Sequence, residues 1–109
     1  MPPKLPLVQG TLDLLVLGAL AGGPRHGYGI ATLIEKRTGG ALDVEDAALY
    51  QSLHRLDRHG LVEAEWRQSE NNRRARYYSI SASGRRRLQE ETVTWRRYSR
   101  AVEAVLQGA

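Results

Sequence analysis

Hydrophobic residues near the start of the chain recur with the spacing of an amphipathic helix. From Thr11 onward, apolar residues return every three or four positions, which places them on one helical face. This face consists of Leu12, Leu15, Val16, Ala19 and Leu20. Thr11 is a candidate N-cap, and the glycines and proline at residues 22–24 end the helix. Because the segment is apolar around most of its circumference, we expect this helix to be central.

The same spacing predicts two more helices. One follows the turn at residues 26–30 and stops at the glycines of residues 39–40. The other has an acidic first turn at Asp46 and ends at Gly60. Their inner faces are Ile30, Leu33 and Ile34 in the first helix, and Leu49, Leu53 and Leu56 in the second.

The outer face of the third helix is polar and carries no acidic side chain. On a helical wheel, Ala47, Gln51, His54 and Arg58 lie opposite the leucines, with Ala48 and Arg55 on the flank. A buried helix would not carry glutamine, histidine and two arginines on one side. The pattern therefore predicts that this face is exposed.

Two alternating segments follow and predict a β-hairpin. Residues 61–67 and 75–80 alternate between apolar and polar side chains, with Tyr78 and Ile80 on one face and Tyr77 on the other. The tip between them, residues 69–74, is polar and basic. The tip and the strand behind it contain Asn71, Asn72, Arg73, Arg74 and Arg76.

The last segment has a heptad-like pattern that predicts a long helix. Ser81 is placed to cap it, and it extends from about Ala82 to the end of the chain. Leu88, Trp95 and Val102 repeat every seven residues, and Glu91, Tyr98 and Val105 follow each of them by three. Glu91 interrupts the apolar pattern. We expect a dimer interface made of Leu88, Trp95, Tyr98, Val102 and Val105.

Composition is compatible with one soluble domain and favours an anionic partner. The 109 residues are 41% hydrophobic and 26% charged, with a formal net charge of +4. The charge alone is a weak indication. The absence of cysteine excludes disulfides, thiolate metal sites and cysteine nucleophiles. No metal or cofactor is expected, because His26, His54 and His59 lack a metal-like spacing and have no acidic cluster beside them.

Two other interpretations of the sequence are disfavoured. Lys4 and the apolar run after it also resemble a short signal peptide, but Asp13 interrupts that run, so a folded helix is favoured. No stretch approaches the length of a membrane span. An enzyme would need a nucleophile with its base or paired carboxylates in a pocket, and the sequence places neither.

The order of elements is helix, helix, helix, hairpin, helix. This order predicts a mainly α protein with a small β-hairpin, the winged variant of the helix-turn-helix followed by a C-terminal dimerisation helix. We expect an N-terminal arm at 1–9, a DNA-binding domain at 10–81 and the dimerisation helix at 82–109. In such a fold the third helix enters the major groove of DNA, and the hairpin touches the flanking backbone.

Five stretches in this order resemble the PadR family of bacterial winged-helix transcriptional regulators. They read GTLDLLVLGAL, GPRHGYGI, ALYQSLHRLDRHGLVEAEW, NNRRARYYSIS and SGRRRL. The compact length resembles the small branch of the family, which has a single C-terminal helix. The resemblance implies a cytoplasmic homodimer, without enzymatic activity, that binds a pseudo-palindromic operator, usually as a repressor, and in some members responds to an aromatic effector.

The resemblance assigns ALYQSLHRL to the recognition helix and ENNRRARYY to the wing. Family members commonly have a small hydroxyl residue where this chain has Ala48, and a proline where it has Gln51. Ala48 cannot donate a hydrogen bond to a phosphate. Gln51 is instead a candidate for reading an adenine edge, and Ala47 or Ala48 for contacting a thymine methyl group.

Several residues retain two interpretations. The arginines of the tip are either solvated or bound to DNA, and the basic outer face of the third helix favours DNA. A basic module that binds an acidic protein is the alternative function. Trp95 is either buried between subunits or a contact for a planar aromatic effector. Tyr28 and Tyr50 are expected to be packing residues.

Overall fold

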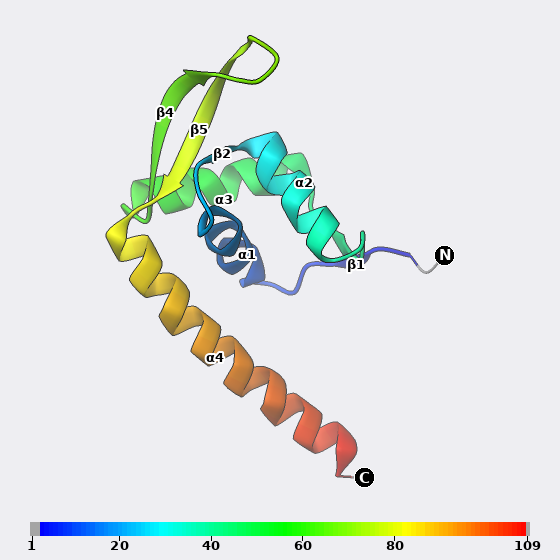
Figure 1. Cartoon of the computed structure of the whole chain (residues 1–109). Helices are drawn as coiled ribbons and strands as arrows, with labels where there is room; N and C mark the ends of the chain where they lie inside the picture. Colours follow the sequence, from blue (N-terminus) through cyan, green and yellow to red (C-terminus); the bar gives the residue numbers. More distant parts are fainter. Residues whose placement is uncertain (1–2, 109) are drawn as a thin grey trace.

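The computed structural model describes residues 3–108 and has the predicted winged-helix order (Figure 1). Its helices are α1 (Thr11–Leu20), α2 (Gly27–Arg37), α3 (Asp46–Arg58) and α4 (Ala82–Gln107). Its strands are β1 (Leu5–Pro6), β2 (Arg25–His26), β3 (Leu42–Asp43), β4 (Val62–Gln68) and β5 (Arg74–Ile80). The first two residues of the predicted N-terminal arm, Met1 and Pro2, and the last residue, Ala109, lie outside the described residues.

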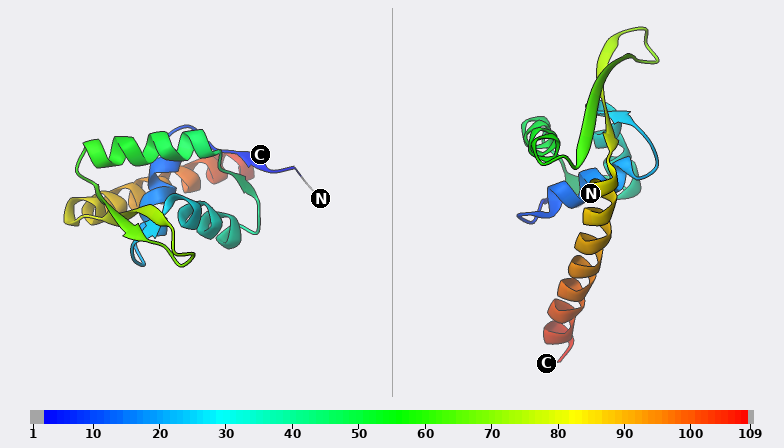
Figure 2. Two further views of the ribbon diagram at one scale, coloured as in Figure 1. Left: turned by 90° about the horizontal axis from the view of Figure 1, so that it is seen from above. Right: turned by 90° about the vertical axis from the view of Figure 1, so that its left-hand side faces the viewer.

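The core forms around α1, as its apolar circumference predicts. This helix packs against α2, α3 and α4, and Val16 and Leu20 are fully buried. The other buried apolar residues are Leu17, Ala19, Ile30, Ile34, Leu49, Leu53, Leu56, Leu61, Val62 and Tyr78. The β4–β5 hairpin and α4 project from this body in opposite directions (Figure 2).

The predicted hairpin carries a third strand. β5 lies between β4 and β2, and Arg25 and His26 of β2 pair with Tyr78 and Tyr77. A second, parallel pair joins β1 to β3, where the Leu5 amide donates a 2.7 Å hydrogen bond to the Ala41 carbonyl. The N-terminal arm is thereby attached to the loop that leads into α3.

Two predicted helix starts are wrong, by one residue for α1 and by about four residues for α2. The N-cap of α1 is Gly10, with φ 87°, and the Thr11 hydroxyl donates back to the Val8 carbonyl at 2.6 Å. α2 begins at Gly27, inside the predicted turn, because His26 Nδ1 accepts a 3.0 Å hydrogen bond from the Gly29 amide. This imidazole takes the role that a serine or aspartate usually has at a helix start.

The predicted cap of α4 is confirmed and also ties this helix to the turn after α3. Ser81 Oγ accepts from the Gly84 amide at 3.0 Å and donates to the Gly60 carbonyl at 2.7 Å. The Ser83 hydroxyl donates to the same carbonyl at 2.9 Å. The start of α4 is therefore fixed relative to the end of α3. Within residues 3–108, no helix is both long enough and apolar enough to cross a membrane.

Candidate nucleic-acid interface

The outer face of α3 is exposed, as the helical wheel predicts. Ala47, Gln51, His54 and Arg58 are exposed, and Ala48 and Arg55 are half-buried. The opposite face is closed by the buried leucines and by Ser52, whose side chain is fully buried. α3 therefore presents amide, imidazole and guanidinium groups in one direction.

Arg55 is anchored by an acidic residue of α1. Its Nε donates to Asp13 Oδ2 at 2.9 Å, and its Nη2 lies 2.5 Å from Asp13 Oδ1. The buried Ser52 hydroxyl donates to the same Oδ1 at 2.6 Å. One carboxylate of α1 thus holds α3 against the central helix. Asp13 therefore occupies the Nε and Nη2 groups of Arg55. The DNA contact expected of Arg55 remains a prediction.

The surroundings of Asp13 keep its carboxylate charged. Partial burial on its own would raise the pKa of Asp13, but hydrogen bonds from Arg55 and Ser52 and the positive charge of Arg55 outweigh it, so the pKa is lowered. The same hydrogen bond raises the pKa of Arg55. The pair is ionised at neutral pH and serves as a structural link.

The wing tip is a tight turn shaped by Asn72. This residue has φ 59°, a left-handed conformation that asparagine tolerates better than most residues, and its amide donates to the Ser69 carbonyl at 2.9 Å. The Gln68 side chain donates to the carbonyl and Oδ1 of Asn72 at 3.1 and 2.7 Å. The Asn72 side chain therefore orders the tip, while Asn71 and Arg73 are exposed beside it.

The two faces of the wing differ in charge. Arg74 and Arg76 lie on the same face as Trp66, and their guanidinium carbons stand 5.2 and 5.7 Å from its ring centroid. On the other face, Arg67 pairs with Glu65 at 2.5 Å and lies over Tyr77. Across residues 3–108 the ion pairs are Arg67–Glu65 and Arg55–Asp13, so Arg74 and Arg76 have no carboxylate partner.

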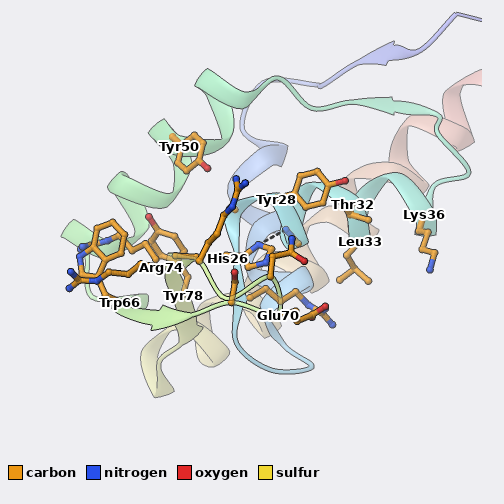
Figure 3. Close-up of a pocket in the computed structure, with 18 residues that line it drawn as sticks. His26, Tyr28, Thr32, Leu33, Lys36, Tyr50, Trp66, Glu70, Arg74 and Tyr78 are labelled. Carbon is orange, nitrogen blue, oxygen red and sulfur yellow. Dashed lines mark hydrogen bonds between the residues drawn. The ribbon is translucent and has the colours of Figure 1, made fainter.

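A groove of about 880 Å³ separates the Trp66 face of the wing from the start of α2 and from Tyr50 of α3 (Figure 3). Cationic side chains from three segments line it: Arg25, Lys36, Arg73, Arg74 and Arg76. Aromatic rings line it as well: Tyr28, Tyr50, Trp66 and Tyr78. Burial raises the pKa of Tyr78, and the positive charge of Arg76 opposes this effect. Glu70 also lines the groove, and Tyr50 is the residue of α3 that reaches it.

The interpretation of Tyr28 and Tyr50 as packing residues is wrong. Tyr28 is 78% exposed and Tyr50 is 54% exposed, both at the groove. On a helix that begins at Gly27, Tyr28 lies about 160° around the axis from the buried Ile30. The exposure of Tyr28 was missed because the start of α2 was misplaced.

The second half of α4 presents an exposed apolar stripe. Tyr98 is 63% exposed, and Trp95, Val102 and Val105 are also exposed. The rings of Trp95 and Tyr98 stack with centroids 6.4 Å apart. Leu106, 67% exposed, extends the stripe beyond the predicted set. Leu88 lies partly buried against the core of its own chain, so its place in a dimer interface remains a prediction.

No group of three histidine, aspartate or glutamate side chains that could hold a metal ion occurs between residues 3 and 108. The exposed, basic and aromatic groups instead lie on α3, on the wing and in the groove between the wing and α2.

Three helices with a β-hairpin after the third define a winged helix-turn-helix protein. The chain matches the model of the transcriptional regulator PadR-like family over residues 16–90, and it belongs to this family. The resemblance noted in the sequence is thereby confirmed, and the family is one of transcription regulators and not of enzymes.

Individual relatives span most of the chain. A protein of Lysinibacillus sphaericus named uncharacterized protein X is 26% identical over 102 residues, which cover 94% of both chains. The crystal structure of a PadR-like transcriptional regulator from Bacillus cereus superposes with a TM-score of 0.79 at 26% identity, over 93% of this chain and 96% of that chain.

One related fold was solved with a nucleic acid. The crystal structure of Bacillus subtilis PadR in complex with operator DNA superposes with a TM-score of 0.68 at 20% identity. The match covers 76% of this chain and 47% of that one. At this identity the likeness concerns the fold.

Proposed function

We propose that this protein is a sequence-specific DNA-binding transcriptional regulator that binds a pseudo-palindromic operator as a homodimer. One observation carries the proposal. The exposed face of α3 and the Trp66 face of the wing are both basic, and Arg58, Arg74 and Arg76 have no carboxylate partner there. Unpaired guanidinium groups on a recognition helix and its wing suit a phosphate backbone. The B. subtilis relative that was solved with operator DNA supports the same role.

The two parts of this surface have different tasks in the proposal. Ala47, Ala48, Gln51, His54, Arg55 and Arg58 of α3 face the major groove. Asn71, Asn72, Arg73, Arg74 and Arg76 of the wing lie against the flanking backbone. Contacts to phosphates fix the register of a protein on DNA, whereas contacts to base edges supply specificity. Gln51 is the residue of α3 best suited to read a base, because its amide can bond both N6 and N7 of adenine.

The proposed dimer forms through the last helix, residues 82–109. Residues 10–81 are then the DNA-binding domain, and residues 1–9 are the N-terminal arm. The supporting observation is the apolar stripe from Trp95 to Leu106, which nothing in its own chain covers between residues 3 and 108. A symmetric pair of α4 helices would bury this stripe and hold two α3 helices at a fixed spacing, which matches an operator with two half-sites.

The regulator acts as a repressor in this proposal, in the cytoplasm of a bacterial cell where its operator lies. A planar aromatic effector releases it by stacking on Trp95 at the dimer interface. The stacked pair of Trp95 and Tyr98 supports this part, because an exposed flat aromatic surface suits a planar ligand.

A titration with two polyanions tests the proposal. Binding of a labelled duplex of mixed sequence is followed by fluorescence anisotropy over a salt series, with polyglutamate of equal charge as a competitor. DNA binding predicts an apparent Kd of roughly 1–100 µM for this non-specific duplex and a steep loss of affinity with salt. Polyglutamate binding as strong as duplex binding would instead identify a basic protein-interaction module.

A further inference from the structure

We propose that Trp66 is a positioning residue that orders Arg74 and Arg76 for DNA, so that the wing meets the phosphate backbone with two guanidinium groups already in place. This inference rests on the proposed DNA-binding function and deepens it. It names a residue outside both the recognition helix and the basic tip that controls affinity without supplying charge.

The hairpin register brings the three side chains together. Trp66 of β4 is the direct cross-strand partner of Arg76, and the next residue on the same face of β4, Gln68, is the partner of Arg74. The two arginines therefore lie directly opposite and diagonal to the indole, both within reach of a large ring. Their guanidinium carbons stand 5.7 and 5.2 Å from the ring centroid, within the range of a cation–π contact.

The position of Trp66 argues against a role in the core. The ring is 54% exposed, on a strand whose buried apolar residue, Val62, lies at the other end. A tryptophan that served only folding would be expected among the buried residues. Instead it lies at the edge of the groove beside Arg74, with Tyr50 across the groove (Figure 3).

The arginines on the two faces of the wing differ in their partners. Arg67, on the opposite face, is neutralised by Glu65. Arg74 and Arg76 pair with no carboxylate, so the indole orients them and leaves their full charge available. Arginine loses much rotamer freedom when it is fixed at an interface. A ring that restricts both arginines before DNA arrives reduces that loss on binding.

The test compares Trp66→Leu, which keeps an apolar strand residue without a π face, with Trp66→Phe, which keeps a ring. Duplex affinity is measured over a salt series on the full chain, and thermal unfolding confirms that each variant folds. Trp66→Leu is expected to lose affinity by roughly three- to tenfold per subunit, and Trp66→Phe to recover most of it. The slope of log affinity against log salt stays at the wild-type value, because no charge is removed.

Two further measurements exclude other roles for Trp66. If Trp66 acts through the two arginines, Trp66→Leu causes no further loss of duplex affinity in a chain that already carries Arg74→Ala and Arg76→Ala. In the free protein, NMR relaxation of the arginine Nε groups shows Arg74 and Arg76 becoming more mobile in Trp66→Leu, while Arg73 at the tip serves as the unchanged internal control.

Failure of the inference is distinct from failure of the proposed function. If the wild-type chain binds DNA but Trp66→Leu binds with wild-type affinity and arginine mobility, the inference is wrong and the proposed function stands. If Trp66→Leu lowers affinity further in the chain that lacks Arg74 and Arg76, Trp66 contacts DNA itself. That result also overturns the inference. If the wild-type chain binds no duplex, the proposed function itself fails.

Discussion

The buried hydroxyl of Ser52 on α3 donates a 2.6 Å hydrogen bond to the carboxylate of Asp13 on α1, which also holds Arg55. α3 is therefore tied to α1 by a charged group as well as by its buried leucines. Asp13→Asn keeps the shape and removes the charge. We expect it to lower the free energy of unfolding by about 1–2 kcal/mol, a value reduced for the partial exposure of the pair. Urea unfolding measures this. Asp43→Asn is the control expected to be unchanged, because Asp43 is exposed and takes part in neither ion pair found between residues 3 and 108.

The same carboxylate predicts a pH dependence. The pKa of Asp13 is lowered in the folded state, so its contribution to stability is present above the unfolded pKa of about 3.9 and is lost as pH falls through the folded value. The stability difference between wild type and Asp13→Asn should be constant from about pH 7 to 5 and shrink below about pH 4. A difference that grows on acidification contradicts this assignment.

Gly84 allows α4 to start against the turn after α3. A Cβ built on Gly84 would lie within 2.1 Å of the Leu61 carbonyl oxygen, a backbone atom that cannot move alone. Gly84→Ala should lower the free energy of unfolding by about 1–3 kcal/mol. Gly18→Ala is the matched control, because nothing lies within 4 Å of a Cβ at that helical position. It should raise stability by about 0.5–1 kcal/mol. Equal midpoints in urea for the two variants would contradict this account.

The dimer is predicted to depend on one side of α4. Trp95→Arg places a charge in the apolar stripe and should shift the protein toward monomer in sedimentation velocity, with a parallel loss of operator affinity. Val93→Arg is the control. Val93 is also exposed, but it lies about 160° around the helix from Trp95. A Trp95→Arg variant that remains dimeric would rule out the stripe as the interface.

The wing arginines are predicted to contribute affinity without specificity. Replacing Arg73 and Arg74 with alanine should weaken operator and non-specific DNA similarly. The slope of log affinity against log salt should flatten by roughly 1 for each phosphate that a subunit no longer neutralises. Replacing Arg96 and Arg97 of α4 removes the same charge far from the wing and should leave the slope unchanged. A loss of preference at flanking A·T pairs would mean that the arginines read a narrow minor groove. If the double variant keeps wild-type affinity and the wild-type salt slope, the arginines of the tip are solvated and do not contact DNA.

Much of the fold was predictable because its main elements carry strong local signals. The leucines of α3 recur at helical spacing, and Ser81 stands directly before a long heptad pattern. The two-residue strands were not predictable, because alternation cannot appear over two positions. Arg25 and His26 join the sheet only through Tyr78 and Tyr77, which lie more than 50 residues away in the sequence.

The part of the candidate site that lies on a single helix was predictable. The contacts between two elements were not. A helical wheel was sufficient to find the exposed face of α3. The link from Asp13 to Arg55 spans 42 residues, and the sequence at Asp13 indicates only an acidic first turn. The contact of Trp66 with two arginines needed the register of the hairpin, which the tip residues alone did not supply.

Gln51 is predicted to read one base position in each half-site. Its side chain is exposed on α3, and Gln51→Ala should relax the preference at that position by about 1–3 kcal/mol while the other positions keep theirs. Competition titrations with operator duplexes changed at one base pair measure this. An unchanged preference at every position would exclude Gln51 from base reading.

Selection of bound duplexes from a random pool tests sequence-specific recognition by the dimer most directly. We expect one enriched motif, an inverted repeat whose half-sites are centred about 10–10.5 base pairs apart or a multiple of that distance, set by the two α3 helices of the dimer. Bound duplexes that share no motif after repeated rounds, at a salt concentration where the protein still retains DNA, would contradict it.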